Sequence, residues 1–250
     1  FSGNIHPNGL FLLSNHSQLN LPFKFAEFNL NLPFSDFGEW EFKSNTAIEY
    51  RWKTNEHQFD LREAYLMWYP SFGEVKLGKQ IHSWGAVDGN NPTDNINAYD
   101  YYYMFLSGTD RKVGSVSAST KIYFDNWQVE GVIIPEHVPN RIPFGEEDFP
   151  FDAQKPAIIE DAENPLEYGI RLQTSLFESD FSISYFNGFD RGFSQKYLNT
   201  LQQNPLERIE FGYRNTEQFG LDFVTFISEF TFRGEFAYFI SQHDNSDILI

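Results

Sequence analysis

Apolar and charged side chains alternate with a period of two along residues 39–53. A β-strand points successive side chains to opposite faces, so this stretch predicts a strand with one apolar face and one charged face. The apolar face begins at Trp40 and ends at Trp52, about 12 residues further on, which is roughly the length of a tilted strand that crosses a bilayer. We therefore expect the apolar face to contact lipid and the charged face to line the inside of a barrel.

The same pattern recurs along the chain and predicts about eleven strands in a single domain over residues 1–250. We expect an all-β fold, an antiparallel up-and-down transmembrane β-barrel. Barrels made from one bacterial chain usually have an even number of strands, so we expect a larger barrel, completed by C-terminal strands that this sequence lacks or by a partner subunit. The predicted strands are 1–6 or 9–13, 24–34, 39–53, 61–69, 74–84, 115–124, 127–133, 167–176, 181–189, 206–227 and 230–240.

The connections between these strands alternate between short and long. Transmembrane barrels have short periplasmic turns and long outer loops, whereas Greek-key sandwiches have no reason to alternate so regularly. Aromatic residues gather at the short-turn end, as expected for a girdle at a membrane interface. The alternative is a soluble β-sandwich or a lipocalin-like barrel. Short connections are predicted at 35–38, 70–73, 125–126, 178–180 and 228–229, and long ones at 14–22, 54–59, 86–112, 139–165 and 191–205.

Composition supports the membrane barrel and excludes other classes. Aromatic residues make up 18% of the chain, which is high for a soluble domain. The absence of cysteine excludes disulfides and thiolate metal sites and fits a bacterial envelope protein. The net charge of −17 argues against nucleic acid as a partner. These features predict a location in the bacterial outer membrane, with lipid and a small solute as partners.

The charges on the predicted inner face are mixed in sign and nearly cancel. They form either a network of paired charges that satisfies a polar interior or a field that selects a permeating solute. His82 would point inward, where a hydrogen-bonding role is favoured over catalysis. The candidate lumen residues are Glu39, Glu41, Lys43, Glu49, Arg51, Lys76, Gln80, His82, Lys121, Glu130, Arg171, Arg208, Glu210, Arg233 and Glu235.

The long loop 86–112 carries two further candidates. Asp88, Asn90 and Asp94 offer closely spaced oxygens that suit Ca²⁺ at a surface loop, although the spacing is not that of an EF-hand and these residues are also ordinary turn formers. No other cofactor is indicated. An aromatic run follows, which either folds inward as a constriction or forms an outer interface belt. This run contains Tyr99, Tyr101, Tyr102, Tyr103 and Phe105.

Four short motifs lie in the first half of the chain: LREAY at 61–65, LGKQ at 77–80, WG at 84–85 and DGNNPTD at 88–94. As a string they resemble a family of Gram-negative outer-membrane barrels of unknown function that is suspected of moving hydrophobic compounds. The resemblance implies a longer barrel and a transport role, and it assigns no functional residue.

The favoured function is an outer-membrane channel, a porin-like transporter that passes a small solute through a charged lumen. One alternative is a structural or binding barrel within a larger outer-membrane assembly. A less favoured one is an outer-membrane lipid-modifying enzyme or hydrolase, because the sequence contains neither a G-x-S-x-G elbow nor an H-E-x-x-H motif.

Overall fold

One large antiparallel sheet dominates the computed structural model, which describes residues 1–5, 10–11, 18–19, 23–34, 39–51, 55–87, 91–106, 108–145, 154–198 and 209–242. Eleven strands, from β1 to β18, pair in chain order, so each strand is hydrogen-bonded to the strand of this sheet that precedes it in the chain and to the one that follows it. The all-β antiparallel fold and its eleven strands are confirmed. The strands are β1 (Ser2–Ile5), β4 (Phe23–Phe34), β5 (Trp40–Arg51), β6 (Glu56–Trp68), β7 (Gly73–Gln80), β10 (Ser115–Phe124), β11 (Trp127–Ile134), β13 (Glu167–Leu176), β14 (Ser179–Phe189), β17 (Asn215–Ile227) and β18 (Phe230–Gln242).

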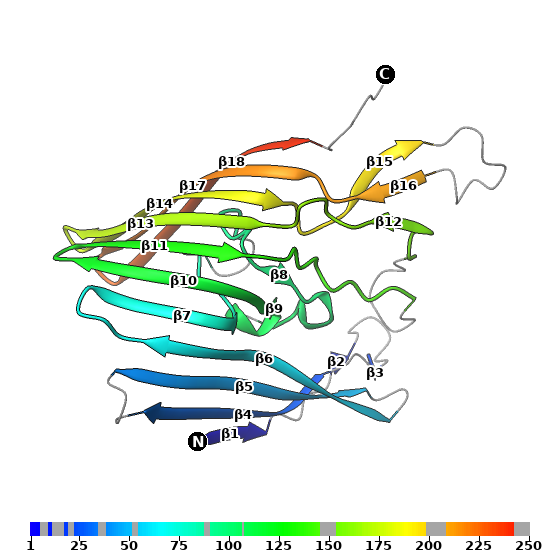
Figure 1. The fold of residues 1–250 in the computed structure, drawn as a ribbon, viewed down its shortest axis with the longest axis horizontal. Coiled ribbons are helices and arrows are strands. Elements are labelled where there is room, and N and C mark those ends of the chain that lie inside the picture. The colour runs from blue at the N-terminus through cyan, green and yellow to red at the C-terminus, as the bar shows by residue number, and fades with distance from the viewer. Residues whose placement is uncertain are drawn as a thin grey trace.

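The sheet is strongly curved, and β1 and β18 form its two edges (Figure 1). No pairing joins these edges among the described residues, so the sheet is open there. Within the same part of the chain, no helix is long and apolar enough to cross a bilayer.

Smaller elements accompany the large sheet. β12 and β16 pair in parallel, and β15 pairs with β16, in a three-stranded sheet that projects beyond the main one (Figure 1). The pair β8–β9 lies on the concave side of the main sheet (Figure 1), and the two 3₁₀ helices contact the sheet through Tyr103 and Asp110. Their bounds are β2 (Leu10–Phe11), β3 (Gln18–Leu19), β8 (Ala98–Tyr99), η2 (Tyr101–Tyr103), η3 (Gly108–Arg111), β9 (Lys112–Val113), β12 (Ile158–Glu160), β15 (Ser194–Leu198) and β16 (Ile209–Gly212).

Three of the predicted boundaries are wrong. The single strand expected over 206–227 is two strands, because β16 ends at Gly212 and joins the three-stranded sheet before β17 begins at Asn215. The long connection expected at 54–59 is short, since β6 already begins at Glu56. The strand expected over 74–84 ends at Gln80, where the chain turns into the concave side.

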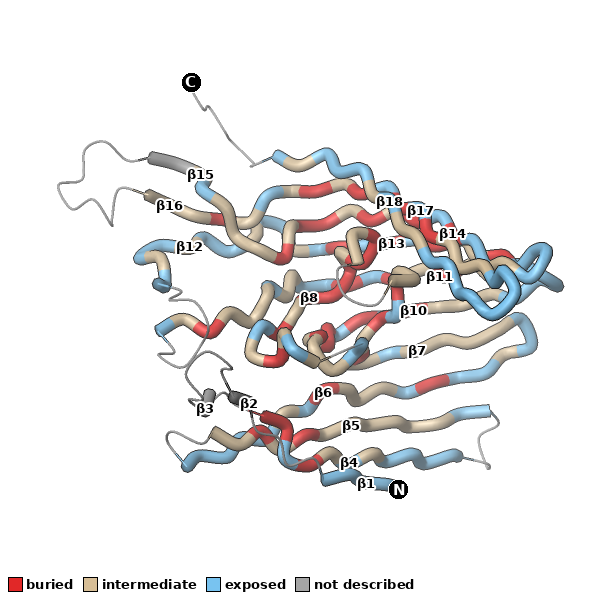
Figure 2. Tube along the Cα trace, turned by 180° about the vertical axis from the view of Figure 1, so that it is seen from behind, coloured by how far each residue is buried: buried red, intermediate tan, exposed pale blue. Residues whose placement is uncertain are grey.

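The distribution of buried residues is the reverse of that in a soluble domain. Among the described residues, which Figure 2 colours by burial, 23 polar or charged residues are buried, against 12 apolar ones. Along β10 the buried positions are Ser115, Ser117 and Ser119, whereas Val116 between them is 59% exposed. The concave face is thus polar and the convex face apolar.

The strand register aligns the apolar positions into rows on the convex face. One row crosses six strands, and its members include Ile183, Leu221 and Phe236, which are 55%, 47% and 64% exposed. The neighbouring positions on the same strands form a row on the concave face that carries only charged or small side chains. The outer row is Ile122, Val129, Leu172, Ile183, Leu221 and Phe236, and the inner row is Lys121, Glu130, Arg171, Ser184, Gly220 and Ala237.

Candidate functional site in the concave interior

A single stretch of chain between β7 and β10 folds into the concave face; we call its described residues, 81–87, 91–106 and 108–114, the inner segment. Trp84 and Ile96 of this segment pack with Val132, Ile134 and Phe186 of the sheet in one small buried apolar cluster. A Cβ atom on Gly169 would lie 2.6 Å from the Trp84 ring, so the inner wall needs glycine at this position. The inner segment is therefore fitted to the sheet by shape as well as by hydrogen bonds.

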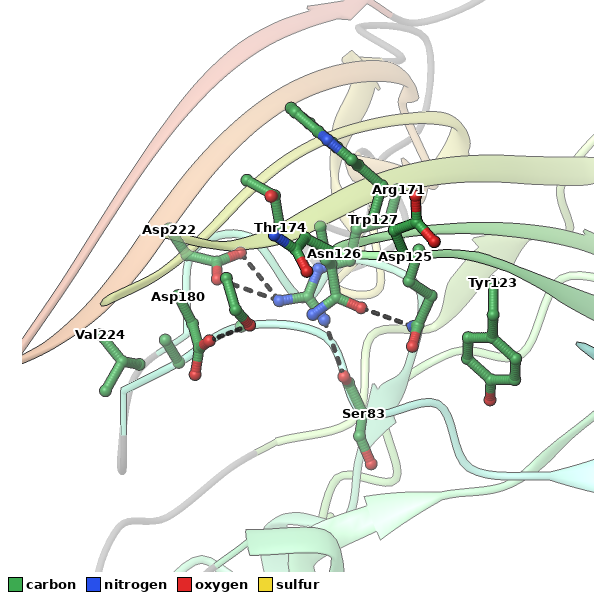
Figure 3. Close-up of a pocket in the computed structure, with 15 residues that line it drawn as sticks. Ser83, Tyr123, Asp125, Asn126, Trp127, Arg171, Thr174, Asp180, Asp222 and Val224 are labelled. Atoms are coloured by element: carbon green, nitrogen blue, oxygen red, sulfur yellow. Dashed lines mark hydrogen bonds and ion pairs between the residues drawn. The ribbon is translucent and has the colours of Figure 1, made fainter. Parts of the chain in front are cut away.

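Arg171 links the inner segment to the wall (Figure 3). Its guanidinium donates two hydrogen bonds to the Asp222 carboxylate, at 2.9 and 3.0 Å, and another to the Ser83 carbonyl at 3.0 Å. Its Nε donates to Ser182 Oγ, which in turn donates to Asp222. Because these contacts occupy all three nitrogens of a buried arginine, Arg171 acts as a structural tie.

Glu130 and His82 provide two further buried anchors. The Trp84 indole donates to Glu130 Oε2 at 3.2 Å, and His82 Nε2 lies 3.1 Å from Ser117 Oγ. Burial, together with nearby lysine and arginine side chains, lowers the pKa of His82 to about 3. His82 is therefore neutral near pH 7 and takes part in the interior as a hydrogen-bonding group.

Arg191 forms a second buried tie at the opposite end of the interior from the short turns. It pairs with Glu167 at 2.8 Å, and Glu167 also lies 2.9 Å from His137 Nδ1. The same guanidinium donates to the carbonyl oxygens of Asn95 and Ile96 in the inner segment. Arg171 on β13 and Arg191 in the connection after β14 thus hold the backbone of the inner segment at two separate places.

The aromatic run of the inner segment lies against the charged face of β5. The Tyr103 hydroxyl donates to Glu49 at 2.6 Å, and Arg141 forms ion pairs with Glu49 and Asp100 at 2.8 and 2.9 Å. The Tyr102 ring lies below the guanidiniums of Arg51 and Arg141, and the Tyr99 ring below that of Arg111. Tyr101 and Phe105 are the more exposed members of the run, at 38% and 54%.

Asp94 is engaged by protein groups. It forms an ion pair with Lys112 and accepts a hydrogen bond from Asn97, and all three residues are buried. The other two proposed calcium ligands, Asp88 and Asn90, lie outside the described residues. No cluster of three or more histidine, aspartate or glutamate residues suited to a metal ion occurs in the described ranges. Calcium binding stays a prediction.

Glu235 on β18 contacts the inner segment from the edge of the sheet. Its carboxylate accepts hydrogen bonds from the backbone N–H groups of Ala86, Val87 and Thr93. The Thr93 hydroxyl donates a fourth hydrogen bond at 2.9 Å. One side chain therefore holds two separate pieces of the inner segment against the edge strand.

Two cavities lie on either side of this contact. The first, of about 570 Å³, is next to the short turns and is lined by Arg171, Asp222, Gly85 and Ala86 (Figure 3). The second, of about 800 Å³, is at the opposite end and is lined by Asn91, Pro92 and residues near Arg191. The inner segment contributes to the lining of both.

The remaining predicted lumen residues are spread over the molecule. Glu41 pairs with Lys43 at 3.0 Å and Lys76 with Glu74 at 3.5 Å, and Lys121 lies between Glu74 and Glu130 in the strand register. Glu39 and Arg233 are exposed, Glu210 belongs to β16, and Arg208 lies outside the described residues.

Several residues that organise the interior were not predicted. Arg62 lies on a strand, but Arg141, Arg191 and Asp100 lie in connections, where a period-two pattern assigns no face. The register between β5 and β6 shifts at Arg62, because Glu63 pairs with Asn45 and Leu61 with Thr46. Arg62 is the extra residue, as in a β-bulge, and a period-two pattern does not predict which face such a residue occupies. The only signal that the sequence offers for these residues is the presence of acidic and basic side chains in the long connections.

The fold and its interior define an all-β protein with an antiparallel meander sheet, a polar concave face and an internal segment. The chain belongs to the family described as protein of unknown function (DUF1302), whose model matches residues 34–249. No curated protein matches the chain.

Proposed function

We propose that the chain forms the wall of a transmembrane β-barrel in the bacterial outer membrane and passes a small solute through its interior. The observation that carries this proposal is the reversed distribution of side chains, with polar residues buried on the concave face and large apolar residues exposed on the convex face. An apolar surface of this extent marks a contact with lipid or protein, because its exposure to water is unfavourable.

Exposed aromatic side chains at the short-turn end support a membrane interface. The Trp40 and Trp68 rings stack with their centroids 5.7 Å apart, and Phe72 meets Trp68 edge to face. Amphipathic rings favour the headgroup level of a bilayer, where barrels carry aromatic girdles. The exposed rings at this end are Phe34, Trp40, Trp68, Tyr69, Phe72, Tyr123, Phe124, Trp127, Phe177, Phe181, Phe226 and Phe230.

The open edges support a wall with more strands than these eleven. An open sheet edge is not stable in hydrocarbon, because its backbone N–H and C=O groups lack partners there. In the proposed barrel, further strands of the same polypeptide or of a partner subunit pair with the edges at β1 and β18 and bring the strand number to an even value.

The two cavities provide the solute path of the proposed channel, and the inner segment forms its constriction. Most charges at this level are paired within the protein, as at Arg171–Asp222 and Arg191–Glu167. The exposed rings of Tyr101 and Phe105 are the members of the aromatic run that remain available to a solute. The resemblance to barrels suspected of moving hydrophobic compounds is consistent with such aromatic contacts.

One observation favours a second candidate, a structural or binding barrel without an open path. The inner segment is tied to the wall by arginines, carboxylates and a small apolar cluster, and such a network also suits a permanently filled interior.

Reconstitution of the purified protein into planar bilayers tests the proposal. We expect discrete conductance steps, and swelling of proteoliposomes in an isotonic solution of a permeant solute. Protein that inserts in the folded state yet never conducts would favour the structural barrel. Protein that stays monodisperse in plain buffer without detergent would contradict the membrane barrel itself.

A further inference from the structure

Aromatic side chains line the cavity of about 800 Å³, which we call the aromatic cavity, although the concave face is mostly polar. Phe239 shares its face of β18 with Glu235, which bonds the inner segment, and it is nevertheless 43% exposed. Tyr101 of the inner segment and Phe193 in the connection after β14 line the same cavity. Three rings from separate parts of the chain thus offer apolar surface to an occupant of the cavity.

Some of these lining groups are held in place by contacts within the protein. The Phe193 ring packs against Phe144 and Phe211, with centroids 5.9 and 5.4 Å apart. Asn140 accepts a hydrogen bond from the backbone N–H of Tyr99 at 2.7 Å, and both residues line the cavity. A site whose groups are ordered before binding loses less conformational entropy when a ligand arrives.

The charges in the cavity lining are balanced and paired. Arg214 bonds Asp190 through Nε at 2.7 Å. Arg191 pairs with Glu167 at 2.8 Å, and Asp94 also has a cationic partner. The described lining therefore offers an ionic solute no unpaired charge of opposite sign. A purely apolar solute is also disfavoured, because it would cover amide and charged groups without bonding them.

We propose that the aromatic cavity binds a neutral, ring-shaped solute with several hydroxyl groups, which is the chemistry of a sugar. The C–H groups of a sugar ring pack on the electron-rich face of an aromatic ring, and its hydroxyls bond amide, carboxylate and guanidinium groups. Asn140, Asp190 and Arg214 supply such groups in the lining. The volume lies within the range of small-molecule sites, roughly 300–1,000 Å³. This inference rests on the proposed channel function and names the class of its solute.

Gly192 is a position from which the cavity can be filled. It lines the cavity, and a Cβ atom there would meet only the Asn140 amide nitrogen among the described residues, at 3.9 Å. Its φ is not positive, so the backbone accepts a larger residue. We expect Gly192→Leu to occupy the cavity and to weaken sugar binding at least about tenfold. Gly131→Leu is the matched control, because Gly131 on β11 has similar space, with Thr120 Cγ2 at 3.8 Å, and lies outside the cavity lining.

Isothermal titration calorimetry of the folded protein, in a detergent without a sugar headgroup, tests the proposal with glucose, maltose and sucrose. We expect saturable binding of at least one of them. Phe239→Leu keeps an apolar side chain but removes the ring, and it should weaken this binding about tenfold. Gly131→Leu should leave the binding unchanged.

Absence of saturable binding for all three sugars in the folded parent protein would overturn the sugar site. Binding that both Phe239→Leu and Gly192→Leu leave unchanged would overturn it as well, and so would tighter binding of toluene than of any sugar. Because calorimetry does not require conduction, the two proposals can fail separately. Sugar binding by a protein that never conducts would keep the site and overturn the channel function.

Discussion

Arg171 and Asp222 form a buried ion pair in the interior, and each is about 5% exposed. Removal of one member of a buried ion pair leaves the other charge without compensation, at a cost of about 3–5 kcal/mol. We therefore expect Arg171→Met to lower the free energy of unfolding by about that amount, measured by urea denaturation in lipid vesicles. The double variant Arg171→Met with Asp222→Leu should lose less unfolding free energy than the single variant. A larger loss in the double variant would contradict the pairing.

His82 gives the interior a defined dependence on pH. Its pKa in the folded protein is about 3, below the ordinary value of 6.5. As the pH falls, His82 is therefore protonated at a higher pH in the unfolded chain than in the folded protein. The contribution of His82 to stability is therefore fully present above about pH 6.5 and is lost as the pH falls from 6.5 towards 3. Urea denaturation at pH 7, 5 and 4 should show that the free energy of unfolding falls less steeply with decreasing pH in His82→Gln than in the parent protein. An equal slope in both would contradict a buried neutral histidine.

At the scale of elements, the fit between the inner segment and the wall depends on a glycine. Gly169 faces the Trp84 ring, whereas a Cβ atom on Gly131, on the adjacent strand β11, would meet only Thr120 Cγ2 at 3.8 Å. Overpacking of a filled interior costs about 1–3 kcal/mol. We expect Gly169→Ala to lower the unfolding free energy by that amount and Gly131→Ala to leave it nearly unchanged. Similar values for the two variants would contradict the packing of Trp84 against β13.

Most of the strands could be predicted from the sequence because they keep a period of two, with polar residues on the concave face and apolar residues on the convex face. The alternation in 39–53 assigns Ala47 and Glu49 to the inner face, and both are buried there. The break after Gly212 was missed because the apolar residues on both sides of it, Ile209 and Phe211 before and Phe219 after, all occupy odd-numbered positions, so the phase does not change across the break. Only the pairing of β16 with β12, between residues far apart in the chain, shows that the strand ends.

The interior could be predicted only in part, because its organising residues belong to connections. The sequence marks residues 86–112 as a long loop, but nothing in a period-two pattern states that the loop folds inward. Trp84 and His82 were expected on a strand, and the structure places them beyond the end of β7. Contacts such as Glu235 with Thr93 join residues 142 positions apart, and local sequence does not encode them.

At the scale of the whole molecule, the convex face determines whether the protein belongs in a bilayer. Leu221 lies in the outer row, 47% exposed, whereas Ile158 belongs to β12, outside the main sheet. A charged side chain on the lipid face of a barrel costs about 2–4 kcal/mol at the midplane of the bilayer and less near the interfaces. Leu221→Arg should therefore reduce the fraction of protein that folds into vesicles, and Ile158→Arg should not. Equal folding of the two variants would place the convex face outside the hydrocarbon.

A nitroxide scan of six consecutive positions on β5, residues 41–46, tests the lipid-facing surface most directly. Glu41, Lys43 and Asn45 share their face of the strand with the buried residues Ala47 and Glu49, and Phe42, Ser44 and Thr46 alternate with them. In vesicles we predict high accessibility to oxygen at 42, 44 and 46, and high accessibility to a water-soluble nickel chelate at 41, 43 and 45. Six positions that respond alike would contradict a convex face in contact with lipid.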